Sequence, residues 1–266
     1  IRTALFLHGG RLGANHTLVE RPARWLIARD LFDQVILPDR RGAGASTVLA
    51  RTPRLEHQAE DMRRLLDRMN IGGPLTALGL DTGGPAALTL AGLDPRVGCV
   101  VLLASGFARA RLSPLADFLR RIGLLRVLLG WEIRRSIGRS TGKPVTFDPV
   151  YDAHSPREMA DSFREALKYV PAARESSLAF DAEVQLDPSL VAVSDQLALS
   201  IPVLQLIGEV DEYWGGEIPA TVLDRFPAFQ RRVVKDMALH NDVFFKAEAY
   251  YNELFDFLKE ACPLVR

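Results

Sequence analysis

The sequence has few cysteines, no long apolar run and no excess charge, and each shortage argues against a class of protein. Its two cysteines, Cys99 and Cys262, lie far apart in a chain of 266 residues. We therefore expect Cys99 to be a small buried side chain and Cys262 to be a residue of the C-terminal segment. We do not expect a disulfide framework or a metal site. No apolar run reaches the roughly 18 residues of a membrane span, so we expect no stable membrane insertion. The formal net charge is zero, which argues against a general nucleic-acid-binding protein.

The overall composition is that of an ordinary globular protein. Hydrophobic residues make up 48% of the chain and charged residues 25%, so a large core can be buried. No signal peptide is visible, and we expect a cytoplasmic protein that is a monomer or a homodimer and acts on a small molecule. Ile1 lies inside an apparent strand, so we also expect that a segment of the natural chain precedes it.

Short apolar runs alternate with segments of helical periodicity. A continuously apolar run is typical of a strand buried on both faces, and alternation with helices is typical of a mostly parallel sheet. The fold class predicted is therefore α/β. The expected strands are 3–7, 34–37, 75–80, 97–104, 202–207 and 230–234, and the expected helices include 21–30, 55–69 and 243–258.

The alternation stops between residues 107 and 200, where turn signals separate several helical segments. We interpret 1–106 and 201–266 as one core and 107–200 as a helical cap inserted into it. Basic residues are frequent over 109–143. We expect a solvated basic helix face there, and contact with a membrane or an anionic substrate is the alternative.

A glycine-flanked aspartate follows the strand predicted at 75–80. Gly79, Asp81 and Gly83 have the spacing of the G-x-S-x-G nucleophile elbow, with aspartate in place of serine. Such a turn strains its central residue and leaves no room for side chains on either side. Alternatively, Asp81 caps the following helix, which has Pro85 in its first turn. This stretch taken alone supports both interpretations.

Several motifs, taken in order, resemble the α/β-hydrolase fold over nearly the whole chain. They are the turn His8-Gly9-Gly10, the loop 39–46, the elbow at Asp81, the helical insertion and a late histidine. An aspartate at the elbow is similar to the branch of epoxide hydrolases and haloalkane dehalogenases. The first two strands usual in the family are not found in this sequence.

The resemblance implies a catalytic triad in the family's order of nucleophile, acid and histidine. Asp211 follows the strand predicted at 202–207, where the family's acid lies, with Glu209 as a weaker alternative. His240 precedes the last helix, where the family's histidine lies. The backbone N–H groups of Gly10 and Thr82 would form the oxyanion hole, and no cofactor is implied.

An aspartate nucleophile indicates the type of bond that is broken. A carboxylate that attacks an acyl group gives an anhydride, whereas attack on a saturated carbon gives an ordinary ester on the enzyme. We therefore expect a hydrolase that opens an epoxide of a bulky, mainly hydrophobic substrate. In relatives a cap tyrosine protonates the epoxide oxygen, and Tyr169, then Tyr151, are the candidates here.

Two alternatives stay open beside the epoxide hydrolase. A haloalkane dehalogenase or another α/β-hydrolase is the first, although Thr82 stands where dehalogenases commonly have tryptophan. A non-hydrolytic binding protein or cyclase of the same fold is the second. The substrate pocket is expected to be lined by four aromatic residues, which could equally be core residues: Trp25, Phe107, Trp131 and Trp214.

Overall fold

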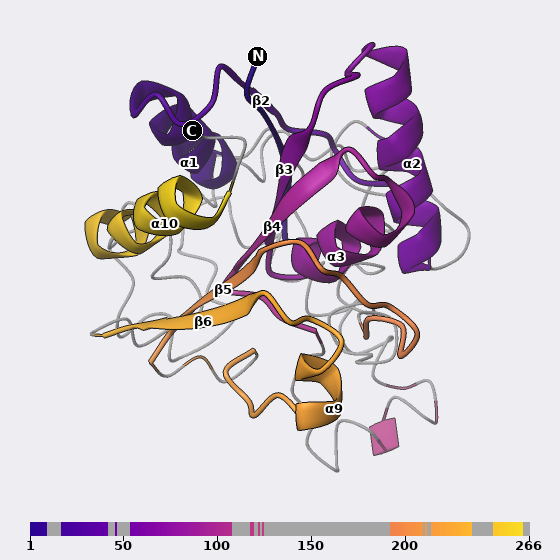
Figure 1. Cartoon of the computed structure of the whole chain (residues 1–266). Coiled ribbons are helices and arrows are strands. Elements are labelled where there is room, and N and C mark those ends of the chain that lie inside the picture. Colours follow the sequence, from indigo (N-terminus) through magenta and orange to yellow (C-terminus); the bar gives the residue numbers. More distant parts are fainter. Residues whose placement is uncertain are drawn as a thin grey trace, which may run out of the picture.

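The computed structural model describes residues 1–9, 17–41, 46, 54–107, 118–119, 122, 124, 192–209, 211, 214–235 and 247–262. These residues form one six-stranded sheet with helices on both faces (Figure 1). The predicted α/β class is confirmed. Nearly all of the predicted cap, 107–200, lies outside the described residues, so the cap remains a prediction.

All six strands run parallel, in the order β2-β1-β3-β4-β5-β6. The strands are β1 (Thr3–Leu7), β2 (Gln34–Ile36), β3 (Leu75–Leu80), β4 (Val97–Leu103), β5 (Val203–Gly208) and β6 (Phe229–Val234). The described helices are α1 (Thr17–Ala28), α2 (Leu55–Arg68), α3 (Gly83–Leu93), α9 (Ala220–Leu223) and α10 (Ala247–Ala261). None of the described helices is both long and apolar enough to cross a membrane.

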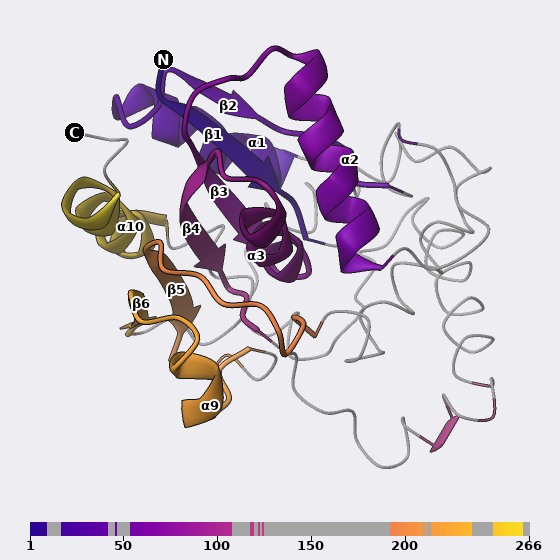
Figure 2. The same ribbon diagram turned by 45° about the vertical axis from the view of Figure 1, so that its right-hand side comes forward.

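Side chains of the central strands point alternately into two apolar clusters. In β1, Ala4 and Phe6 join the cluster that includes residues of α1 and α10, whereas Leu5 and Leu7 join the cluster of α2 and α3. Figures 1 and 2 show the two helix pairs on opposite faces of the sheet. Burial on both faces explains why the strands are continuously apolar in sequence.

The prediction that the two cysteines are unconnected is wrong. Cys99 of β4 and Cys262, directly after α10, form a disulfide with their Cα atoms 5.7 Å apart. Both belong to the same apolar cluster, because α10 packs across the sheet face to which Cys99 points. Sequence separation did not reveal this proximity, because parallel strands bring distant segments together.

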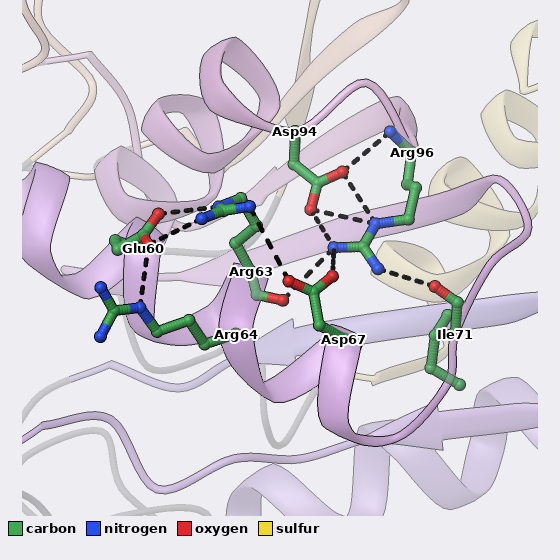
Figure 3. Close-up of polar contacts among 7 residues, drawn as sticks. All are labelled: Glu60, Arg63, Arg64, Asp67, Ile71, Asp94 and Arg96. Carbon is green, nitrogen blue, oxygen red and sulfur yellow. Dashed lines mark hydrogen bonds and ion pairs between the residues drawn. The ribbon is translucent and has the colours of Figure 1, made fainter.

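A network of ion pairs ties α2 to the turn between α3 and β4 (Figure 3). The Arg96 guanidinium binds the carboxylates of Asp94 at 2.6 Å and Asp67 at 2.8 Å, and it also donates to the carbonyl of Ile71. Burial raises the pKa of the Asp94 carboxyl, but the hydrogen bonds from Arg96 outweigh it and hold that pKa below its usual value. The network lies at the amino ends of the strands, at the opposite end of the sheet from Asp81. There it holds the layer of α2 and α3 against the sheet.

Candidate active site

The strand order places several of the predicted site residues at the carboxyl ends of the strands. From β1 the chain continues to β2 on one side and later to β3 on the other, so strand order reverses between β1 and β3. Ligands of open α/β sheets bind at such a switch point, outside the carboxyl ends of the strands. His8 and Gly9 follow β1 there, and Asp81 follows β3.

The elbow at Asp81 has the strained geometry that its glycines predict. Asp81 has a φ of 46°, in the left-handed region that non-glycine residues rarely adopt. Its backbone N–H donates to the carbonyl of Leu103 at 3.1 Å, and its carbonyl accepts the Gly84 N–H at 3.0 Å. A Cβ atom on Gly83 would lie 2.7 Å from the His8 carbonyl oxygen, so only glycine fits there.

Asp81 is not the cap of α3. The helix begins at Gly83, and its N-cap position is Thr82, which has helical dihedrals and no side-chain capping bond. The Asp81 carboxylate instead accepts a hydrogen bond from the indole Nε1–H of Trp214 at 3.0 Å. The alternative that Asp81 caps the helix is therefore wrong, and its side chain is oriented by another loop.

The two carboxylate oxygens of Asp81 face different neighbours. Oδ1 accepts the Trp214 indole N–H, while Oδ2 lies 3.2 Å from the position that a Cβ atom on Gly9 would occupy. Gly9 belongs to the turn in which the oxyanion hole is predicted. Oδ2 is thus on the side of the turn after β1, and Oδ1 is on the Trp214 side.

Asp211 is buried beside the same tryptophan. Its Oδ1 accepts the backbone N–H of Trp214 at 2.9 Å, and its own carbonyl accepts the N–H of Gly215 at 2.9 Å. Trp214 therefore contacts both predicted catalytic carboxylates, one through its backbone and one through its ring. Gln205 of β5 supports this loop by donating to the Trp214 carbonyl at 3.3 Å.

The turn after β1 is held by the loop after β2. The backbone N–H of Arg40 donates to His8 Nε2 at 3.1 Å, which leaves the ring proton on Nδ1, 2.5 Å from the Gly9 carbonyl oxygen. The Arg40 guanidinium is buried and donates to the Thr82 hydroxyl at 2.9 Å. Neither His8 nor Arg40 was assigned a site role from sequence, although both stand in the motifs that carry the family resemblance.

The described structure brings together only some of the predicted site residues. Asp81, Thr82, Asp211 and Trp214 lie together at the carboxyl edge of the sheet. Trp25 and Phe107 pack against the two apolar clusters, as expected of core residues. Trp25 stacks on Tyr251 with ring centroids 4.3 Å apart, and Phe107 packs on Phe226 at 4.7 Å. The remaining candidates lie outside the described residues, and their roles stay predictions: Gly10, Trp131, Tyr151, Tyr169 and His240. The described residues contain no cluster that could hold a metal ion.

The fold is that of a known family. The model of the alpha/beta hydrolase fold family matches residues 3–247. The solved structure of a thermophilic esterase from Thermogutta terrifontis has 24% identity and a TM-score of 0.71, covering 98% of this chain and 90% of the esterase. An enol-lactonase from Burkholderia xenovorans LB400 has 20% identity and a TM-score of 0.64, covering 97% of this chain and 92% of the lactonase.

Comparison with curated proteins found no match. The likeness to the solved structures concerns the fold, and it carries nothing specific to epoxides. The family match extends over most of the chain, including the elbow, the loop of Asp211 and the predicted histidine. The chain belongs to the α/β-hydrolase fold family.

Proposed function

We propose that this protein is a hydrolase in which the Asp81 carboxylate attacks a saturated carbon of the substrate, forming an ester on the enzyme. The observation that carries this proposal is the aspartate at the elbow, held at a φ of 46° with its carboxylate bonded to Trp214. A group held in a strained conformation at a sheet switch point is typical of a catalytic centre. An epoxide of a bulky hydrophobic molecule is the first candidate substrate.

The orientation of the carboxylate fits a two-step reaction. In the first step Oδ1 bonds to the substrate carbon, and the electron pair of the broken carbon–oxygen bond goes to the leaving oxygen, which takes a proton from an acid, the role predicted for Tyr169. Oδ2 becomes the ester carbonyl on the Gly9 side. In the second step His240, oriented by Asp211, removes a proton from water, and the hydroxide attacks the ester carbonyl. Oδ2 then carries the negative charge, beside the predicted oxyanion hole.

Carbon–halogen cleavage is the second candidate, and Trp214 favours it. The sequence lacks the tryptophan that commonly follows the nucleophile in dehalogenases, but the Trp214 indole N–H lies 3.0 Å from Asp81 Oδ1. An indole N–H is a hydrogen-bond donor that does not give up its proton at neutral pH. A departing halide needs only such a donor, whereas an epoxide oxygen needs a proton.

Ester or lactone hydrolysis is the alternative that the names of the structural neighbours favour. The chain has a G-x-S-x-G spacing at 138–142, centred on Ser140, in the segment between β4 and β5. The sequence before it contains Arg134 and Arg135, whereas the sequence before a nucleophile elbow is a continuous apolar run. We therefore assign the nucleophile to Asp81.

The test is to trap the ester. His240→Gln should block the second step, so incubation with styrene oxide should add the full mass of the epoxide to the protein. Incubation with 1-bromohexane should add the hexyl group without bromine if the enzyme is a dehalogenase. Intact mass and peptide mapping should place either adduct on Asp81.

Two control variants separate the alternatives. Asp81→Asn in the His240→Gln background should give no adduct, and Ser140→Ala should leave turnover unchanged. If Asp81→Asn still hydrolyses an ester or a lactone while Ser140→Ala does not, the protein is a serine esterase and the proposal is wrong. Absence of an adduct with any electrophile would contradict both alkylation candidates.

A further inference from the structure

We propose that Arg40 is a positioning residue for the oxyanion hole and acts through Thr82. This inference rests on the proposed function, because the oxyanion hole matters only if an ester at Asp81 is hydrolysed. Arg40 lies in the loop that follows β2, and its side chain is only 5% exposed. A buried guanidinium is costly to desolvate, so the contacts that it makes there need an explanation.

The guanidinium of Arg40 fixes the residue that follows the nucleophile. Nη2 donates to the Thr82 hydroxyl at 2.9 Å, and Nη1 lies 3.4 Å from the Thr82 carbonyl oxygen. Nη1 also donates to Gln58 Oε1 of α2 at 2.8 Å, which anchors the guanidinium from the other side. Contacts to both the side chain and the carbonyl restrain the dihedrals of Thr82, and with them the direction of its N–H.

The backbone of Arg40 contacts the turn after β1. Its N–H donates to His8 Nε2 at 3.1 Å, and the protonated Nδ1 of that ring faces the Gly9 carbonyl. His8 and Gly9 lead directly into Gly10, the other predicted oxyanion donor. One residue thus connects the turn after β1 with the turn after β3.

The chemistry predicts which step depends on Arg40. During alkylation the Asp81 carboxylate loses negative charge, so a nearby cation and an ordered oxyanion hole give the transition state no advantage. During ester hydrolysis an oxyanion forms, and correctly directed N–H donors stabilise it. Loss of Arg40 should therefore slow the second step and leave the first step unchanged or faster.

The experiment follows both steps in single turnovers, with styrene oxide and 1-bromohexane as probes and intact mass as the readout. Arg40→Met should form the ester as fast as the wild type and hydrolyse it at least about tenfold more slowly, since loss of one oxyanion donor costs roughly 100- to 1,000-fold. The ester should accumulate. Arg40→Lys keeps the charge without the forked donors and should give an intermediate hydrolysis rate.

Two further variants make the result specific. Arg41→Met is the matched control, because the neighbouring Arg41 pairs with Asp61 on α2, and it should keep both rates of the wild type. Thr82→Val removes the hydroxyl that accepts the hydrogen bond from Arg40. This variant tests the same contact if Arg40→Met fails to fold. Its hydrolysis step should slow, and adding Arg40→Met should slow it less than Arg40→Met slows the wild type, because both changes remove the contact between the guanidinium and the hydroxyl.

Equal slowing of both steps in Arg40→Met, or rates like those of Arg41→Met, would overturn this inference. Failure of the proposed function can be told apart from failure of this inference, because ester trapping in His240→Gln tests the proposed function separately. If the ester forms in His240→Gln but does not accumulate in Arg40→Met, only the role of Arg40 is overturned. No ester in His240→Gln overturns the proposed function and the role of Arg40 with it.

Discussion

Replacement of Trp214 by phenylalanine tests what the indole N–H does at the nucleophile. The N–H donates to Asp81 Oδ1 at 3.0 Å, and Trp214 is only 2% exposed, so water does not compete for the bond. A hydrogen bond to a charged group contributes about 1.5 to 3 kcal/mol. Because Oδ1 loses charge as it attacks carbon, the bond weakens in the transition state unless the leaving group takes it over.

The two candidate substrates predict different effects of Trp214→Phe. If a departing halide accepts the N–H, the bond persists in the transition state, so the loss of Trp214 should change the rate of alkylation by 1-bromohexane little. Alkylation by styrene oxide should be faster by up to roughly 10- to 150-fold, because its oxygen depends on a proton that an indole does not supply and the bond to Oδ1 weakens in that transition state. About 1.36 kcal/mol corresponds to a factor of ten. The ratio of the two rates should fall by about tenfold or more.

The assay measures adduct formation over time by intact mass in the His240→Gln background, so that only the first step counts. Trp25→Phe is the matched control, because Trp25 stacks on Tyr251 in the helix layer of α1 and α10. Thermal melting of both variants checks that they are folded. If Trp214→Phe alkylates with both probes at the rates of Trp25→Phe, the N–H has no role in the reaction and the reasoning is refuted.

Three other predictions concern stability. Gly83→Ala would place its methyl carbon 2.7 Å from the His8 carbonyl oxygen and should cost about 2 kcal/mol or more together with most activity, whereas Gly72→Ala, with open space around it, should melt like the wild type. Reduction of the disulfide, whose cysteines are 163 residues apart, should lower the free energy of unfolding by about 4 to 5 kcal/mol. Two free thiols in the unreduced, unfolded protein would show that the disulfide does not form. The pKa of Asp94 is lowered because hydrogen bonds from Arg96 outweigh burial, so its contribution is complete above its unfolded pKa of 3.8 and is lost as pH falls through the lower folded value. Asp94→Asn should therefore cost about 1 to 3 kcal/mol in urea unfolding at pH 7 and flatten the acid dependence, and an unchanged acid profile would contradict the assignment.

Much of the sheet could be predicted from sequence because its strands are buried on both faces and are therefore continuously apolar. The strand predicted at 97–104 is β4, Val97–Leu103, and it ends where Ala104 adopts a φ of 41°. Helix ends were less predictable. The helix predicted at 21–30 spans Thr17–Ala28, because Asp30 has a φ of 56° and cannot continue it.

The elbow could be predicted from the spacing of its glycines. Gly79 and Gly83 are needed where a Cβ atom would meet backbone, and this requirement is visible in the spacing alone. The contacts of Trp214 and Arg40 could not be predicted, because they depend on where the loops after β5 and β2 run in space. The aspartate of the elbow was recognisable in sequence, but the donors that orient it were not.

Labelling with oxygen-18 tests most directly whether Asp81 is the nucleophile. Wild-type enzyme in excess over substrate is allowed one turnover in H₂¹⁸O, and the product and the peptide containing Asp81 are then analysed by mass. Attack by Oδ1 followed by hydrolysis of the ester predicts that the label enters the Asp81 carboxylate and that the product carries an unlabelled oxygen from the enzyme. Label in the product with an unlabelled Asp81 peptide would show that water attacks the substrate directly, and would contradict the proposal.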